Sequence, residues 1–162
     1  YWSGVLGVIR SQSGKELSWM AFVMLFVFWV WMYQIRLLIA IVLGRMSFSG
    51  LSGFLDTLFY TPQGWIFLGI GHLVGAALSL ILFSITVVSI PMLLDREVDF
   101  ITAMIRSLLA VMASPVAYGV WACIIGVVTL LAMLPFFLGL FIVMPIFGHA
   151  TWHLYKTVTT DP

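Results

Sequence analysis

Three histidines are the residues of this chain whose type and spacing could support chemistry. His149 and His153 lie four residues apart in the run GHATWHLY, so on a helix both imidazoles would share one face and could offer a metal ion two ligands. No HExxH motif accompanies them, and a carboxylate ligand would have to come from Glu97 or Asp99. The alternative interpretation is that both histidines hydrogen-bond to backbone carbonyls or to the acidic residues near position 95.

His72 differs from the other two because it lies inside a long apolar stretch, in the run GIGHLVG. Ionisable residues within a membrane are rare and often functional. Together with His149 it could ligate a b-type haem, for which Gly69, Gly71 and Gly75 would leave room. The alternative is a neutral His72 that hydrogen-bonds to a serine, a threonine or a carbonyl group. We expect this second state, and therefore predict neither a cofactor nor a metal.

Charged residues are scarce, and several gather between positions 89 and 115: Asp95, Arg96, Glu97, Asp99 and Arg106. Apolar residues recur from 98 to 112 at the period of a helix, with the polar residues on the other face. This pattern predicts an amphipathic helix over 96–112 that lies along a membrane face, with Asp95 as its N-cap. Because no nucleophile or metal motif accompanies the carboxylates, we predict that the protein is not an enzyme.

The elements that must position these side chains are dominated by apolar residues. Of 162 residues, 63% are hydrophobic and 8% are charged, far from the balance of soluble domains, which indicates an integral membrane protein. The net charge of +1 gives no basis for nucleic-acid binding. The single cysteine, Cys123, excludes an internal disulfide.

Four apolar runs are long enough to cross a bilayer, which requires about 20 helical residues. The predicted spans are 17–43, 63–90, 116–134 and 136–155. A further short surface helix is expected over 50–60. The fold class is therefore all-α, a polytopic transmembrane helical bundle of about four spans with interfacial helices, in one domain over 1–162. Because the chain begins at Tyr1 without a charged leader, we expect it to be the C-terminal part of a longer protein.

Helix-start signals precede three of these runs. Ser13 and Glu16 have the spacing of a capping box, in which each side chain satisfies a free backbone N–H group. Thr61-Pro62 and Ser114-Pro115 each combine an N-cap residue with proline at the first helical position. Pro91 is expected to close the second span.

A ridge of small residues is expected on the second span, formed by Gly71, Gly75 and Ser79. Small residues four apart let another membrane helix approach closely, so this ridge is a predicted helix-packing face.

Lysine and arginine residues divide unevenly between the two predicted membrane surfaces. One surface has Arg10, Lys15, Arg96, Arg106 and Lys156, and the other has Arg45 and Arg36. The positive-inside rule then places residues 89–114 and 156–162 in the cytoplasm and residues 44–61 on the outer side.

Two long runs resemble an uncharacterised family of bacterial, alphaproteobacterial-type integral membrane proteins. They are FSITVVSIPMLLDREVDFITAMIRSLLAV and LPFFLGLFIVMPIFGHATWHLYK, and the blocks PMLLDREVDF and GHATWHLY within them are the most specific. The family is described as predicted integral membrane proteins with a domain of unknown function. The resemblance implies a membrane location and a helical fold, and it supplies no catalytic residues.

The leading hypothesis is a non-catalytic accessory or structural subunit of a larger complex in a bacterial inner membrane, respiratory or photosynthetic. Its partners would be membrane lipid and other integral membrane subunits. One alternative is a transporter or channel component, although such proteins normally carry acids or unwound half-helices near the midplane. Another is a membrane protein that binds haem or a metal through its histidines.

Overall fold

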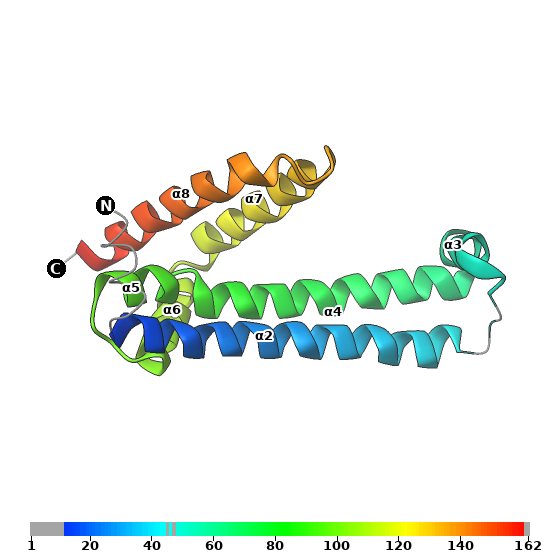
Figure 1. The fold of residues 1–162 in the computed structure, drawn as a ribbon, viewed down its shortest axis with the longest axis horizontal. Helices are drawn as coiled ribbons and strands as arrows, with labels where there is room; N and C mark the ends of the chain where they lie inside the picture. The colour runs from blue at the N-terminus through cyan, green and yellow to red at the C-terminus, as the bar shows by residue number, and fades with distance from the viewer. Residues whose placement is uncertain (1–11, 45, 47, 161–162) are drawn as a thin grey trace. The chain divides into compact units, whose positions relative to one another are not determined.

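The part of the chain that the structure describes is mainly helical and contains no strand. The computed structural model describes residues 12–44, 46 and 48–160 (Figure 1). The helices are α2 (Gln12–Leu38), the π-helix η1 (Ile39–Leu43), α3 (Gly50–Tyr60), α4 (Pro62–Thr86), α5 (Ser89–Asp95), α6 (Phe100–Ala113), α7 (Pro115–Met133) and α8 (Leu140–Thr160). The expected all-α class is confirmed, and a helix is present over 50–60 as expected.

The chain divides into two compact units. One is Phe22–Leu82, and the other joins Tyr1–Ala21 to Phe83–Pro162.

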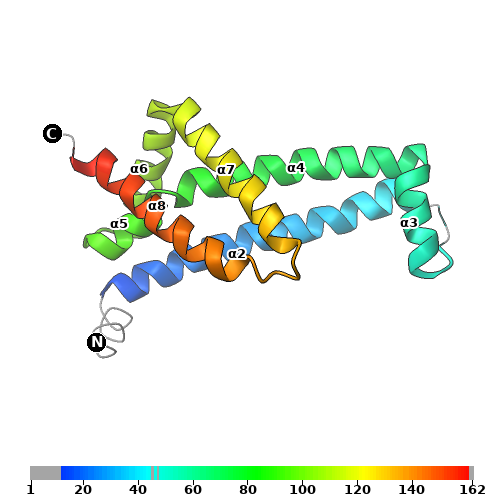
Figure 2. The same ribbon diagram turned by 90° about the horizontal axis from the view of Figure 1, so that it is seen from above.

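In the unit Phe22–Leu82, α2 and α4 lie side by side as a hairpin (Figures 1 and 2). A Cβ atom placed on Gly71 would lie 3.8 Å from Cδ1 of Leu38, and one placed on Gly75 would lie 3.4 Å from Nε1 of Trp31. Large side chains of α2 therefore occupy the space that the missing side chains of α4 leave.

The turn from α3 into α4 is fixed by Thr61. Its hydroxyl oxygen accepts a hydrogen bond from the backbone N–H of Gly64 at 3.1 Å, which confirms the expected start of this helix. The carbonyl groups of Thr57 and Leu58 lie so close to Gly64 that a Cβ atom would not fit there. Glycine is required at this position because the backbone of α3 packs directly on that of α4.

The second unit is centred on the break between α4 and α5. Its buried core is made by Met20, Val87, Val88, Met92, Leu93, Ala103, Tyr118 and Tyr155. Helices α5 and α6 pack together here, and α8 and α7 each contact one of them. The chain then forms a hairpin of α7 and α8 (Figure 1).

The expected continuous helix over 63–90 is wrong at its end. Helix α4 stops at Thr86, and Pro91 is the third residue of the new helix α5 instead of a terminator. Proline has no N–H group, and its ring clashes with the carbonyl four residues earlier, here that of Val87. The chain therefore breaks at Val87 and Val88, and Pro91 is accommodated in the first turn of α5.

The amphipathic helix also begins later than expected, at Phe100 instead of residue 96. Residues 97–99 form no helix, and both Arg96 and Asp99 have extended backbone angles. Asp95, expected as the N-cap, is instead the last residue of α5, where its backbone is helical. The N-cap is Asp99, because a capping residue requires an extended backbone.

The connection between α7 and α8 is longer than expected. Turns occupy residues 134–139, and Phe136 and Phe137 both have positive φ angles, of 50° and 66°. Helix α8 therefore begins at Leu140, four residues after the predicted start.

Three helices in the described part of the chain are long and apolar enough to cross a membrane: Gly14–Leu43, Pro62–Asp95 and Pro115–Met133. In the second run, the 25 residues of α4 extend about 37 Å, which already exceeds the ~30 Å apolar core. We therefore place α5 outside the spanning segment.

The fourth predicted span, 136–155, is not among these helices. Helix α8 carries Pro145, His149, His153 and Lys156, and these residues lower its apolar character.

Candidate functional site

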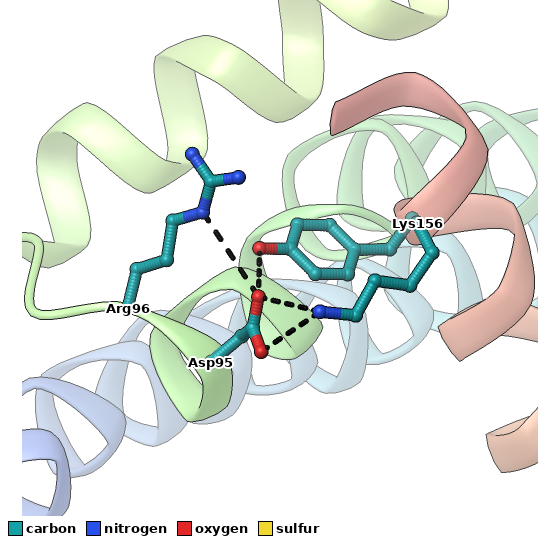
Figure 3. Close-up of polar contacts among 4 residues, drawn as sticks. Asp95, Arg96 and Lys156 are labelled. Carbon is teal, nitrogen blue, oxygen red and sulfur yellow. Dashed lines mark hydrogen bonds and ion pairs between the residues drawn. The ribbon is translucent and has the colours of Figure 1, made fainter. Parts of the chain in front are cut away.

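The densest group of charged contacts lies where the end of α5 meets α8 (Figure 3). Lys156 donates to both carboxylate oxygens of Asp95, with Nζ 3.0 Å from Oδ1 and 2.9 Å from Oδ2. The hydroxyl of Tyr155, a fully buried residue, donates to Oδ2 at 2.8 Å. Nε of Arg96 lies 3.9 Å from the same oxygen. Asp95 therefore ties α8 to α5 across 61 residues of sequence.

These contacts stabilise the ionised form of Asp95. The hydrogen bond from Lys156, and then that from Tyr155, hold the pKa of this carboxyl below its ordinary value. Lys156 also lies over an aromatic ring, with Nζ 5.0 Å from the ring centroid of Trp152. Asp95 and Lys156 therefore form an ion pair, and the ammonium group of Lys156 also contacts the aromatic ring of Trp152.

Two carboxylates satisfy the N-terminus of α6. The side chain of Asp99 accepts a hydrogen bond from the N–H of Thr102 at 2.8 Å, and this bond lowers the pKa of Asp99. Oε2 of Glu16 accepts from the N–H of Phe100 at 3.0 Å. A ring contact supports the same junction, because Trp19 stacks on Phe100 with centroids 5.9 Å apart.

The capping box expected for the start of α2 is therefore wrong for Glu16, whose carboxylate caps α6 instead. The side chain of Ser13, its expected partner, lies outside the described residues. Glu16 is available to α6 because α2 packs beside it in the same unit. A free N–H group at a helix start attracts any carboxylate within reach, whether near or far in sequence.

Ser107 joins α6 to the break between α4 and α5. Its hydroxyl is buried, accepts a hydrogen bond from the N–H of Val88 at 3.1 Å and donates to the carbonyl of Ser84 at 2.8 Å. Ser89 adds a bond from its hydroxyl to the carbonyl of Ile85 at 2.6 Å. These bonds satisfy backbone groups that the break would otherwise leave unpaired inside the core.

The predicted histidines bond within their own helices. Nδ1 of His72 donates to the carbonyl of Leu68 at 2.7 Å, and Nδ1 of His149 donates to the carbonyl of Pro145 at 3.0 Å. Both imidazoles are exposed, and so is that of His153. His72 belongs to one compact unit, and the other two histidines belong to the second.

Among the residues that the structure describes, no three His, Cys, Asp or Glu side chains are grouped so that they could hold a metal ion.

The other predicted residues have plainer surroundings. Glu97 and Arg106 are exposed, the first in the loop before α6 and the second on α6 itself. Gly71 and Gly75 face α2, and Ser79 is exposed.

Sequence reasoning did not predict Ser107, Tyr155 or the distant role of Glu16. One signal was present for Ser107, because Ala103 lies four residues before it and two small residues at this spacing predict a contact face. No local signal pairs Tyr155 or Glu16 with partners 60 and 84 residues away.

These polar groups therefore stabilise the fold: they cap the start of α6, bond to the backbone at the break between α4 and α5, and join α5 to α8.

Comparison with known proteins gives one match. The family described as "Predicted integral membrane protein (DUF2189)" matches residues 1–95, which includes α2 to α5. No curated protein matches the chain. No solved structure matches it either.

Proposed function

The chain belongs to this DUF2189 family of predicted integral membrane proteins, and from that premise we propose that it is a non-catalytic accessory subunit of a larger membrane complex. The complex would lie in a bacterial inner membrane and be respiratory or photosynthetic. Its partners would be membrane lipid and the helices of other integral subunits.

One observation carries this proposal: the polar side chains that could have done chemistry are engaged in holding helices. Asp95 binds Lys156 and Tyr155, while Glu16 and Asp99 cap α6. These hydrogen bonds lower the pKa of Asp95 and of Asp99, whereas a general acid or base needs a pKa near the working pH. Such an arrangement supports a structural role.

The exposed surface of the spanning helices is the second support. Large apolar side chains such as Phe22, Trp29, Val120 and Val127 are more than half exposed. In a membrane this surface meets lipid or neighbouring helices, and it gives a subunit room for contacts on more than one side.

Photo-crosslinking in the native membrane tests the proposal. A benzophenone amino acid would be placed, in separate variants, at the exposed positions Val120 and Val127 on α7 and Phe22 on α2. Irradiation before mild-detergent purification should give discrete protein adducts from at least one helix, and the same proteins should co-purify with the unmodified chain.

A matched control is the same amino acid at Ile105 of α6, on a different exposed surface. If all three positions on the spanning helices give lipid adducts alone and the chain purifies without other proteins, the accessory-subunit proposal is wrong.

A further inference from the structure

Helix α6 is too short to span and connects two parts of the chain that can. Its 14 residues extend about 21 Å, whereas the apolar core of a bilayer is about 30 Å thick. It follows the crossing helix α4 and the short helix α5, and it precedes the crossing helix α7. Both ends of α6 therefore lie on the same side of the membrane, close to the surface.

Three sectors divide the circumference of α6. On the sector that faces the protein, the small residues Ala103 and Ser107 are completely buried, and the larger Phe100, Met104 and Val111 pack against the core beside them. Diametrically opposite lie five large apolar side chains that are 42–66% exposed: Ile101, Ile105, Leu108, Leu109 and Met112. On the flank between them lies the exposed Arg106, about 100° around the axis from Ile105.

The sizes of these side chains indicate what covers the exposed apolar sector. Helices in membranes often pack closely through small residues, and the two fully buried residues of α6, Ala103 and Ser107, are of this kind. The outer sector has no small residue: it consists of bulky isoleucine, leucine and methionine side chains that are exposed, and such side chains suit fluid acyl chains. A second copy of the chain or another subunit would therefore be a poorer match than lipid.

We propose that α6 lies in the plane of the membrane surface, with its Ile101–Met112 apolar sector inserted among phospholipid acyl chains and Arg106 at the level of the phosphates. The alkyl part of an arginine side chain can lie along apolar surface while its guanidinium group reaches the phosphates. The partner of this face is the lipid bilayer itself, a conclusion that does not depend on the accessory-subunit proposal.

The contacts at its protein-facing side fix the depth of α6. Glu16 holds its first N–H group, and Ser107 holds its centre to the break after α4. A helix pinned at two points to membrane-crossing segments cannot move away from the surface without breaking buried hydrogen bonds. The insertion is therefore a permanent part of the fold.

Spin-label accessibility in reconstituted vesicles tests this inference. Single cysteines would be introduced by Ile105→Cys, Leu109→Cys and Arg106→Cys in a Cys123→Ser background, because Cys123 is exposed and would also react. Each nitroxide is measured against oxygen, which concentrates in the bilayer, and a water-soluble nickel chelate. Labels at 105 and 109 should collide mainly with oxygen, and the label at 106 mainly with the chelate.

Two results would overturn the inference. Labels at 105 and 109 that are shielded from both reagents would show that protein covers this face, and labels dominated by the chelate would show that it faces water. Each labelled protein must melt at the temperature of the Cys123→Ser parent. Leu108→Cys, in the same exposed sector, replaces any variant that does not.

Discussion

The hydroxyl of Ser107 stabilises the break between α4 and α5 inside the core. It accepts from the N–H of Val88 and donates to the carbonyl of Ser84, so both backbone groups at the break are satisfied. A membrane protein cannot rely on water for such groups. A short side chain that both donates and accepts fits this place better than a larger one, because the neighbouring Ala103 is also fully buried.

Ser107→Ala should therefore lower the free energy of unfolding by roughly 1–3 kcal/mol, the usual cost of leaving a buried polar group unpaired. Thermal or denaturant unfolding in detergent would measure the change. Ser52→Ala, at an exposed position on α3, is the matched control and should have little effect. Equal stability of the two variants would contradict the bridging role.

Asp95 gives the α5–α8 contact a dependence on pH. Because its pKa is lower in the folded protein than the ordinary value of 3.8, the stabilisation is present above that value and is lost as the pH falls through the folded pKa. Melting temperature should fall below about pH 4 in the parent. The Asp95→Asn variant should have a lower melting temperature above that pH, and its melting temperature should fall less on acidification. An equal fall in the variant would show that other groups, such as Asp99, cause the pH dependence.

The histidines are expected to be structural. His72 and His149 each donate from Nδ1 to a carbonyl of their own helix, so each imidazole has a hydrogen-bond partner without any ligand. The purified protein should show no haem absorption band, and His72→Gln should keep normal assembly because an amide can still donate. A Soret band that disappears in both His72→Gln and His149→Gln would establish haem binding.

At the scale of elements, the contact between α2 and α4 depends on where glycines lie along α4. Gly75 lies against Trp31 and Gly71 against Leu38, so the predicted small-residue ridge contacts a helix of its own chain at these two positions. By contrast, Gly69 has open space where a Cβ atom would lie. Comparing the same substitution at Gly75 and at Gly69 therefore distinguishes its effect on helix packing from its effect on helix propensity.

Gly75→Leu should force Trp31 to move and destabilise the hairpin by about 1–3 kcal/mol, the usual cost of overpacking. Gly69→Leu introduces the same residue into the same helix without a neighbouring atom, and should be neutral or slightly stabilising. Unfolding in detergent and resistance to proteolysis would measure both. If the two variants behave alike, close packing at Gly75 is not important.

At the scale of the whole molecule, the membrane orientation is the property that the charge distribution predicts. The excess of lysine and arginine on the predicted surface that includes residues 89–114 predicts that this segment lies in the cytoplasm and residues 44–61 on the outer side. The bonds of Lys156 to Asp95 bring the end of α8 to the segment that would lie in the cytoplasm.

Cysteine labelling in intact cells and in inverted vesicles checks this orientation. In a Cys123→Ser background, Ser49→Cys should react with a membrane-impermeant maleimide only from outside, and Glu97→Cys only in inverted vesicles. Both positions are exposed in connections between helices. Reaction of both from the same side would refute the topology, and exchange of the two sides would refute the orientation alone.

The sequence alone determined the class of the protein, most of its helices and several of their starts. Hydropathy and helical period are properties of neighbouring residues, so the apolar runs, the surface helix over 50–60 and the cap at Thr61 could be predicted locally. The amphipathic helix was predicted too, but its start was displaced because two aspartates, Asp95 and Asp99, were both suitable N-cap residues.

Only the tertiary structure decided which polar groups pair. Glu16 could cap its own helix or that of Phe100, and Asp95 could cap α6 or bind Lys156; each choice depends on which backbone and charged groups the packed helices bring within about 3 Å. The break likewise required Ser107, which lies 19 residues after Val88 in the sequence. Hydrogen bonds act over a few ångströms in space, whatever the separation in sequence, and that is why local patterns could not predict them.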